Sequence, residues 1–494
     1  MKYISVEEAG KKFNLSARSI RNYCSQGRIP GAVLSGKTWL IPNDAKKPDR
    51  ANSKNEETAL ENLRYGNDLV SFINESPVAC YAIKNVSNIL IKKGYNEVKE
   101  YQRFNFKAGD KVFIVRNDTT IVAFNIGKNV DDNHPYFHVV VSHADSPSFK
   151  VKPEANTTTD KYTKINVAPY GGMIVPSWLD RPLSIAGKVV INKENSVKTE
   201  LVNLSDYTLF IPNVCIHFNR DINSGYDYNM AVDTQPFVAF EDNASLKDEI
   251  ASNLKLKKED IVNFDLFLYN KQSGIVWGKK NEFISSGRLD DLMCVYTSSI
   301  AFSDTNNDNA INVLYIADNE EVGSSSNQGA DSDFLKSSLL RVCKDLNLEY
   351  EVAVANSFLV SADNGHAVHP NKPYLTDSDN KIYMNKGIAI KFNATGAYTS
   401  DAISSAIFQK ICDNASVPYQ FFTNRSDVRG GATLGRILLS QVSLMSVDIG
   451  LAQLAMHSSY ETAGTKDIKY AIDAFKEFYS SNIVVDGNSY KITK

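Results

Sequence analysis

The sequence predicts an α/β protein in which a β-rich segment interrupts the alternation of strands and helices. A small basic unit of two short helices and a hairpin precedes this main body. Three observations lead to this fold class. Apolar stretches of strand length are separated by helical patterns along most of the chain, which is typical of α/β folds. Residues 155–275 instead show β-rich alternation with many turn residues, and residues 1–50 differ from the remainder in charge.

The charge divides the chain into a basic and an acidic part. Residues 1–50 carry 10 Lys and Arg against 4 Asp and Glu, a net charge of +6, whereas the remaining residues carry 44 against 53, a net charge of −9. The stretch NDAKKPDRANSKNE that follows the basic part is polar, contains a proline and lacks an apolar run, which is linker composition. We therefore expect a basic module over 1–50 and a linker over 51–57.

Within the basic module, Ser5 and Glu8 have the spacing of a capping box, which predicts a helix over 5–12. A second helix is expected over 16–26, and GRIPGAVLSGKTWLIP predicts a small hairpin. Two short helices and a hairpin wing form a helix-turn-helix layout. The segment YISVEEAGKKFNLSARSIRNYCSQGRIPGAV…GKTWLIP resembles the winged helix-turn-helix of excisionase-type DNA-binding modules.

This resemblance implies that the second helix enters a major groove and that Arg18, Arg21 and Arg28 contact DNA. A retained or repurposed basic module with a solvated charged face fits the same residues. A single copy is expected to bind DNA weakly unless oligomerisation multiplies the contacts.

The main body is predicted from its apolar periodicity. Buried strands are expected at Phe137–Ser142, Asn312–Ala317 and Val352–Val360, and helices at 59–73, 290–303, 332–345 and 400–413. TKINVAP, GKVVINK, SVKTELVNL and NFDLFLYN predict the strands of the insert. We therefore expect an α/β domain over 58–153 and 276–494, interrupted by a β-rich domain over 154–275.

Composition excludes several classes of protein. Hydrophobic residues make up 43% and charged residues 22%, as in globular proteins, and no run approaches the roughly 20 apolar residues of a membrane span. The N-terminus lacks the layout of a signal peptide. The six cysteines are widely spaced without a CxxC pair, which is typical of reduced thiols. These features predict a cytoplasmic protein with no membrane partner.

Acidic residues and histidines cluster in short segments, several of them directly after a predicted strand. These segments contain His143 with Asp145, Asp290 with Asp291, Glu320 with Glu321, Asp363 with two nearby histidines, and His457. Taken singly, each pattern is more typical of a local hydrogen bond or a solvated helix start. Together they can converge on one sheet edge. Histidines and carboxylates without cysteine favour a catalytic zinc, manganese or cobalt site, and a bridging carboxylate suits two metals.

Ordered motifs make a resemblance specific. SHADSPSFKVKP, YGGMIVPSWLDRPLSIAGKV, IPNVCIHFNR, EFISSGRLDDL, DNEEVGSSS, SADNGHAVHPN, SDVRGGATLG and DIGLAQLAMHS occur in this order. From about residue 60 to the C-terminus, the chain resembles the aspartyl aminopeptidase family of dinuclear zinc metallopeptidases. The resemblance implies a metallopeptidase α/β sandwich with an inserted domain, and release of N-terminal residues, Asp or Glu among them, from peptides.

The resemblance also implies the role of each matching residue. His143 and Asp363 would hold one metal, Glu321 and His457 the other, and Asp290 would bridge them. Glu320 would be the general base, and Asp145 the carboxylate that orients His143. The residues that would contact the substrate are His217, His369, Lys391 and Tyr398, with His217 reaching a neighbouring subunit's site. The family further implies a closed homo-oligomer, typically a dodecamer built through the inserted domain.

Three departures from the family pattern leave the substrate preference open. Ser459 and Tyr460 precede Glu461 where the family often has Arg, the segment before GATLG reads SDVRG, and Arg436 stands where Pro is frequent. Two other functions also stay open. One is a DNA-binding regulator with an inactive or sensing peptidase-like domain, and the other is a metallohydrolase of acyl amino acids. Because every expected ligand and the base are present, the sequence favours the aminopeptidase.

Overall fold

In a computed structural model, residues 2–25, 28–36, 38–47, 51–130, 133–242 and 244–494 are described, and for 51–57 the backbone alone. Residues 26–27 and 48–50, which the predictions placed in the basic module, lie outside this description. The chain forms two compact units, Met1–Glu61 and Asn62–Lys494. Among the described residues, no helix combines the length and apolarity needed to cross a bilayer.

The first unit contains two short helices and a small antiparallel sheet. Its elements are β1 (Tyr3–Ile4), α1 (Val6–Phe13), α2 (Ala17–Ser25), β2 (Val33–Ser35) and β3 (Thr38–Pro42), with strand order β1-β3-β2. The predicted capping box is confirmed, because the Glu8 N–H donates to Ser5 Oγ and the Ser5 N–H donates to the Glu8 carboxylate. Phe13, Ile20 and Ile41 are buried in the core of this unit.

Helix α3 (Ala51–Asn74) begins earlier than the sequence predicted. The residues 51–57, expected as a linker, form its first turns. The difference has a physical reason: the segment is polar but contains Ala, Lys and Glu, which are good helix formers and extend an already nucleated helix. The other end of α3 buries Leu69, Phe72 and Ile73 in the core of the second unit.

A mixed sheet forms the centre of the second unit. Within the described residues, nine strands lie in the order β20-β19-β21-β17-β7-β16-β6-β5-β4. They are β4 (Asn96–Glu97), β5 (Lys111–Arg116), β6 (Thr120–Ile126), β7 (Phe137–His143), β16 (Ile311–Ala317), β17 (Phe358–Ala362), β19 (Ile388–Lys391), β20 (Tyr419–Phe422) and β21 (Met445–Gly450). The central strands β21, β17, β7 and β16 are parallel, so their carboxyl ends meet at one edge.

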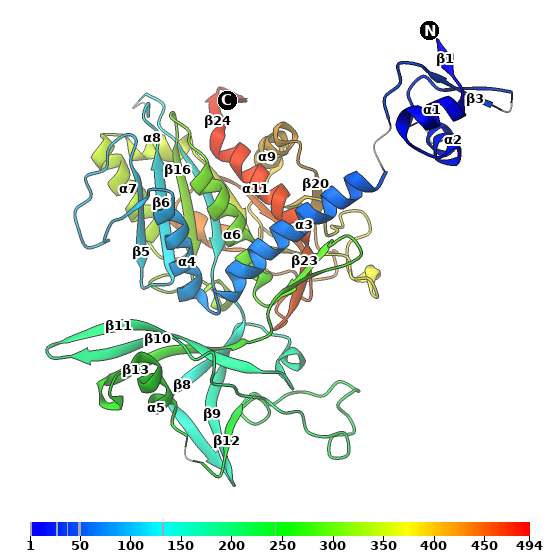
Figure 1. Cartoon of the computed structure of the whole chain (residues 1–494). Helices are drawn as coiled ribbons and strands as arrows, with labels where there is room; N and C mark the ends of the chain where they lie inside the picture. The colour runs from blue at the N-terminus through cyan, green and yellow to red at the C-terminus, as the bar shows by residue number, and fades with distance from the viewer. Residues whose placement is uncertain (1, 26–27, 37, 48–50, 131–132, 243) are drawn as a thin grey trace. The chain divides into compact units, whose positions relative to one another are not determined.

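Helices cover both faces of this sheet. One apolar layer includes residues of α3, α4 (Ala79–Lys92), α6 (Leu289–Asp304), α9 (Ala402–Ala415) and α11 (Thr465–Ser480), several of which are visible across the sheet in Figure 1. The other layer includes residues of α7 (Phe334–Leu346), α8 (Tyr350–Ala355) and α10 (Leu434–Gln441). The predicted α/β class is therefore confirmed as a three-layer sandwich.

One predicted strand was wrong in its first half. Val352–Val360 covers the end of α8 and the start of β17, rather than one continuous strand. The valines at 352 and 354 favour a strand by propensity, but the short helix buries Ala353 against the helical layer instead. The strands predicted at 137–142 and 312–317 are confirmed as β7 and β16.

The insert forms a sheet of its own with the strand order β11-β10-β13-β8-β9-β12. Its elements are β8 (Ser148–Thr159), β9 (Tyr162–Tyr170), β10 (Leu183–Lys193), β11 (Ser196–Asn203), β12 (Phe237–Phe240), α5 (Leu246–Leu254) and β13 (Ile261–Asn270). The sheet thus begins six residues before the expected boundary at 154. The long β8 and β9 carry the chain away from the α/β sandwich.

A second, smaller sheet has the order β14-β15-β23-β22-β18 and borders the carboxyl edge of the main sheet. Its strands are β14 (Ile275–Trp277), β15 (Phe283–Ser286), β18 (Gly365–His366), β22 (Ala452–Leu454) and β23 (Glu461–Gly464), and the chain ends in the hairpin of β24 (Asn482–Asp486) and β25 (Ser489–Thr493). Because β18 follows directly after β17, the two sheets meet where the main strands end.

His138 on β7 makes stability depend on pH. It packs between the rings of Tyr136 and Phe478 at centroid distances of 5.1 and 4.9 Å, and within the described residues neither ring nitrogen has a hydrogen-bond partner. Burial lowers the pKa of His138 from 6.5 to about 3. Between these values the unfolded chain binds a proton that the folded chain does not. The contribution of His138 to the free energy of unfolding is therefore complete above pH 6.5. As the pH decreases from 6.5 toward 3, this contribution decreases by about 1.4 kcal/mol per pH unit.

We expect His138→Phe to remove this loss, because the new ring fills the same space and cannot be protonated. Unfolding midpoints near pH 7.5 and near pH 5 should therefore differ less in the variant than in the parent. The exposed His369, substituted in the same way, is the control and should keep the parent's pH dependence. An equal loss in parent and His138→Phe would contradict the assignment.

Candidate metal centre

The expected metal ligands come from loops that meet at the carboxyl edge of the main sheet. His143 is the last residue of β7, Glu321 lies in a 3₁₀ turn after β16, and Asp363 follows β17. These three strands are parallel neighbours, which brings the three side chains to one edge. Asp290 lies at the start of α6 after β15, and His457 lies in the turn between β22 and β23.

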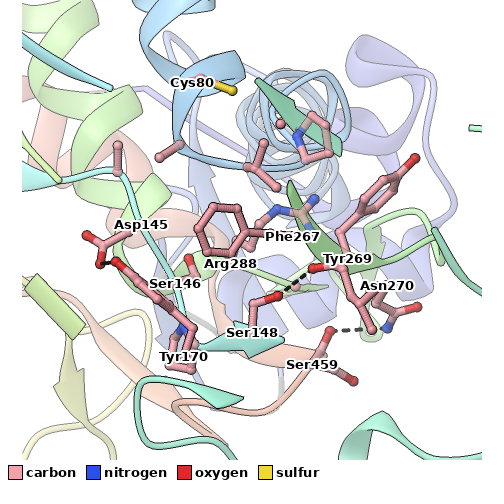
Figure 2. Close-up of a pocket in the computed structure, with 18 of the residues that line it drawn as sticks. Cys80, Asp145, Ser146, Ser148, Tyr170, Phe267, Tyr269, Asn270, Arg288 and Ser459 are labelled. Atoms are coloured by element: carbon pink, nitrogen blue, oxygen red, sulfur yellow. Dashed lines mark hydrogen bonds between the residues drawn. The ribbon is translucent and has the colours of Figure 1, made fainter. Parts of the chain in front are cut away.

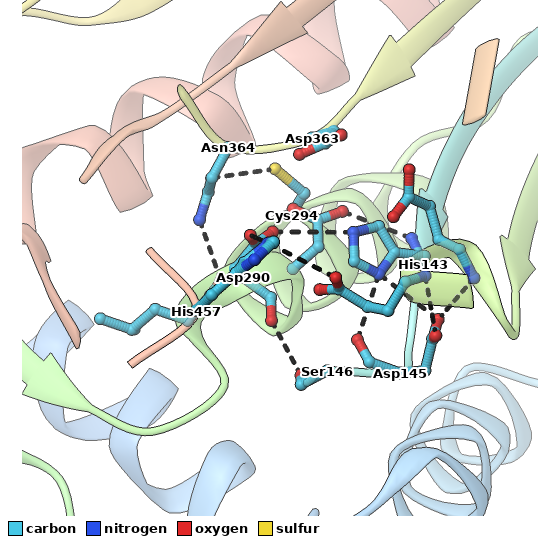
Figure 3. Close-up of polar contacts among 12 residues, drawn as sticks. His143, Asp145, Ser146, Asp290, Cys294, Asp363, Asn364 and His457 are labelled. Carbon is cyan, nitrogen blue, oxygen red and sulfur yellow. Dashed lines mark hydrogen bonds and ion pairs between the residues drawn. The ribbon is translucent and has the colours of Figure 1, made fainter. Parts of the chain in front are cut away.

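The five side chains form two groups that share Asp290. Ligand atoms of His143, Asp290 and Asp363 lie within 4.8 Å of one another, and so do those of Asp290, Glu321 and His457. His143 Nε2 is 3.6 Å from Asp290 Oδ1, whereas His457 Nε2 is 3.5 Å from Asp290 Oδ2. Each oxygen of one carboxylate therefore faces a different histidine, and Figure 3 shows these side chains converging.

Glu320 belongs to a third group of this kind. Its carboxylate and ligand atoms of His143 and Glu321 lie within 4.8 Å of one another, so Glu320 is part of the same site. Burial, together with neighbouring carboxylates that include Asp363, raises the pKa of Glu320 to about 8. A carboxyl group whose proton affinity is raised in this way is suited to accept and return a proton near neutral pH.

Backbone carbonyls fix the protonation of both histidine rings. His457 Nδ1 lies 2.7 Å from the Gly172 carbonyl oxygen, and His143 Nδ1 lies 3.1 Å from the Asp145 carbonyl oxygen. A carbonyl oxygen only accepts hydrogen bonds, so each Nδ1 carries the hydrogen and donates it. Each Nε2 points toward Asp290 and is the ring nitrogen that would bind a metal ion there.

The Asp145 carboxylate contacts more than His143. One oxygen lies 3.5 Å from His143 Nδ1, but the carboxylate also accepts the backbone N–H groups of Glu320 and Glu321 at 3.1 and 3.2 Å. The Tyr170 hydroxyl donates to it at 2.7 Å. Asp145 thus holds the turn that carries both glutamates. The sequence analysis missed Tyr170, because the residue ends a β-strand of the insert and no local pattern signals its contact.

The donor set fits divalent cations. Asp290 Oδ1 and Glu321 Oε1 are buried, and neither has a hydrogen-bond partner among the described residues. Buried anionic oxygens without partners are costly unless a cation compensates them. The residues offer imidazole nitrogens and carboxylate oxygens without cysteine, which are ligands of catalytic zinc.

The four residues expected to contact substrate differ in burial. Lys391 and Tyr398 are buried together, with Lys391 Nζ 5.4 Å from the Tyr398 ring centre and 3.7 Å from Asp363 Oδ1. Lys391 Nζ also donates to the Asn364 carbonyl at 2.8 Å, so it adjoins the metal centre. His369 and His217 are both exposed, and His217 lies on the connection between β11 and β12.

The arginines expected to contact DNA lie on or just after α2 of the first unit. Arg18 and Arg21 are exposed, and Arg21 pairs with Glu7 at 3.1 Å. Arg28 is half-buried, with its guanidinium 4.4 Å from the Tyr23 ring centre.

A cavity of about 70 Å³ lies near the metal centre but is distinct from it, because none of the five expected ligands lines it (Figure 2). Tyr170, Phe267 and Arg288 are among its lining residues. The Arg288 guanidinium donates to the carbonyls of Ile73 and Ser76 at the end of α3. The Arg288 guanidinium is therefore paired with backbone carbonyls of the fold. The residues suited to metal-dependent chemistry are the two groups of ligands that share Asp290.

Comparisons with known proteins match most of the chain. The family model described as Aminopeptidase I zinc metalloprotease (M18) matches residues 72–479. The probable M18 family aminopeptidase 2 of Clostridium novyi is 43% identical over 429 residues, covering 85% of this chain and 99% of the relative. The probable aspartyl aminopeptidase of Ricinus communis is 32% identical over 488 residues, covering 87% and 99%. The S. cerevisiae mApe1 dodecamer structure is 26% identical with a TM-score of 0.74, covering 84% of this chain and 96% of that one.

We expect Asp290→Asn to lose bound metal, because the amide supplies one neutral oxygen where the carboxylate offers two anionic ones. Purified protein, dialysed and assayed by mass spectrometry for metal, should fall from two ions per chain to less than one. Asp486→Asn, at an exposed carboxylate paired with Lys491, is the control and should keep both ions. Two tightly held ions in Asp290→Asn would contradict a bridging role.

Proposed function

Because the chain belongs to the M18 family of aminopeptidase I zinc metalloproteases, and is therefore a metal-dependent aminopeptidase, we propose specific roles for the residues of its metal centre. His143 and Asp363 would hold one zinc ion, Glu321 and His457 would hold the other, and Asp290 would contribute to both. The observation that carries this assignment is the Asp290 carboxylate, whose two oxygens face two different histidines.

Glu320 is the general base in this proposal. When bound, the zinc pair would lower the pKa of a shared water and polarise the scissile carbonyl. Glu320 accepts a proton from the attacking water and returns it to the leaving amine nitrogen. Asp145 positions the base for this step. Its carboxylate accepts the backbone N–H groups of Glu320 and Glu321, and it also lies next to the His143 ring.

The substrates are peptides with a free N-terminus. Lys391 and Tyr398 adjoin Asp363, which supports a place for them in the wall of the substrate pocket. A relative is named a probable aspartyl aminopeptidase, so acidic N-terminal residues are among the proposed substrates. His369 is proposed as a further substrate contact.

A homo-oligomer follows from the family, and we propose a dodecamer for this chain as for the S. cerevisiae relative. Val214, Ile216 and Phe218 are exposed on the connection that carries His217. Apolar side chains exposed together are typical of surfaces that associate. This supports assembly through the insert, with His217 supplied to a neighbouring subunit's site.

The N-terminal unit is proposed to be a winged helix-turn-helix that binds DNA weakly. Two short helices, a three-stranded sheet and a net charge of +6 over residues 1–50 support this, as do the exposed Arg18 and Arg21 on α2. The comparisons do not support the alternative of a DNA-binding regulator with an inactive peptidase domain. The DNA contact is therefore an accessory to the enzyme. We also propose the cytoplasm as its location, which the absence of a disulfide among the described cysteines supports.

We expect Glu320→Gln to keep both metals and to lower kcat by about 10²–10⁴-fold, because the amide cannot accept the proton. Aminoacyl chromogenic substrates, Asp and Glu included, would be assayed with zinc and after chelation, alongside N-acetylated controls. Cleavage of the acetylated compounds would instead point to an acyl amino acid hydrolase. Full activity in Glu320→Gln would refute the role of Glu320.

For the N-terminal unit, we expect Arg18→Ala with Arg21→Ala to weaken binding of a labelled random-sequence duplex about tenfold or more, with peptidase activity unchanged. Each lost phosphate contact should also reduce the salt dependence measured by fluorescence anisotropy. Lys46→Ala with Lys47→Ala removes the same charge outside α2 and is the matched control. If the arginine pair and the lysine pair weaken DNA binding equally, the DNA is attracted by the net charge of the unit and α2 is not the binding helix.

A further inference from the structure

Glu461, the first residue of β23, is buried and connects two of the expected ligands through their backbones. It is 2% exposed. The Asp290 N–H donates to Glu461 Oε2 at 3.0 Å, and the His457 N–H donates to Glu461 Oε1 at 2.8 Å. One carboxylate thus fixes the main chain at both residues.

These two residues belong to separate elements, so their relative position is not set by local structure. Asp290 starts α6, and His457 lies in a turn with φ of 67°, in the left-handed region that non-glycine residues rarely adopt. Such a conformation is unfavourable for a residue with a side chain and persists only where surrounding contacts hold it. The hydrogen bond from the His457 N–H to Glu461 is such a contact.

The Glu461 carboxylate is also connected, through Gln453, to the segment after β17 that carries Asp363. Gln453 Nε2 lies 3.4 Å from Glu461 Oε1, and Gln453 Oε1 accepts a hydrogen bond from Asn364 Nδ2 at 2.7 Å. Asn364 follows the expected ligand Asp363 and also donates to the Leu289 carbonyl, directly before Asp290. Hydrogen bonds therefore join the backbones around three of the expected ligands.

We propose that Glu461 is a positioning residue that sets the affinity of the Asp290, Glu321 and His457 group for its metal ion. This proposal rests on the ligand roles proposed above. An ionised carboxylate has acceptor lone pairs on both oxygens, as two N–H donors require. A glutamine offers one oxygen and one NH₂ group, so one backbone N–H loses its acceptor and meets a donor instead. Asp290 or His457 must then shift.

The test is Glu461→Gln in the full-length protein, with zinc affinity measured by competition against a chromogenic chelator. Loss of a group that orients metal ligands typically costs 10–100-fold in affinity, so we expect one of two zinc ions to bind that much more weakly. We also expect excess zinc to restore kcat, with KM for the peptide close to the parent's. Because excess metal also stabilises a merely destabilised fold, the zinc affinities are compared with those of a structural control.

Asp467 provides a matched control. It is likewise a buried carboxylate that accepts two backbone N–H groups, from Asn385 at 2.6 Å and Gly387 at 2.9 Å, but none of the expected metal ligands donates to it. Asp467→Asn should lower the unfolding midpoint and leave both zinc affinities as in the parent. If Glu461→Gln keeps both affinities, or if the two variants lose zinc equally, the proposal is overturned.

A milder variant covers the case in which Glu461→Gln does not fold. Glu461→Asp keeps the charge but is one methylene shorter, so it cannot reach both N–H groups, and we expect weakened binding of one zinc ion with excess zinc restoring kcat. Parent-like zinc affinity in this variant would overturn the proposal. The ligand roles themselves are tested separately by Asp290→Asn, so their failure is distinguishable from a failure of Glu461 alone.

Discussion

Mutual repulsion among buried carboxylates is the constraint on which the rest of the site depends. Asp145, Asp290, Glu321, Asp363 and Glu461 lie close together at one sheet edge, and each needs compensation for leaving water. Asp145 and Glu461 receive it from backbone N–H groups, and Asp363 from Lys391. Asp290 and Glu321 retain oxygens without such partners. Among the expected ligands, Asp363 is thus partly compensated by Lys391, whereas Asp290 and Glu321 each keep a buried oxygen that a bound cation would compensate.

Much of this arrangement could be predicted from the sequence, because its signals are local. An apolar strand ending in His143, another ending before Glu320, and a third ending before Asp363 predict convergence once the strands are taken as parallel neighbours. The helix over 59–73 was predicted, but its extension back to Ala51 was not, because residues 51–57 are polar and lack an apolar run. The helical part of Val352–Val360 was not predicted either, because its valines favour a strand. Glu461 and Tyr170 could not be assigned, because their partners are distant in sequence and their hydrogen bonds involve backbone or hydroxyl groups.

The expected metal ligands come from both the main sheet and the small sheet. The main sheet supplies His143, Glu321 and Asp363 from consecutive parallel strands, so their spacing follows from ordinary strand geometry. Asp290 and His457 come from the borders of the small sheet, where no such regularity exists. The additional hydrogen bonds of Glu461, Gln453 and Asn364 occur on that side. The turn after β16 is held in the same way by Asp145, so specific polar contacts fix the irregular backbone on both sides of the site.

The hydrogen bonds between Arg288 and the end of α3 have a structural consequence. Arg288 donates to the carbonyls of Ile73 and Ser76 and lies two residues before Asp290. A displacement of this end of α3 would therefore be transmitted to the backbone directly before Asp290.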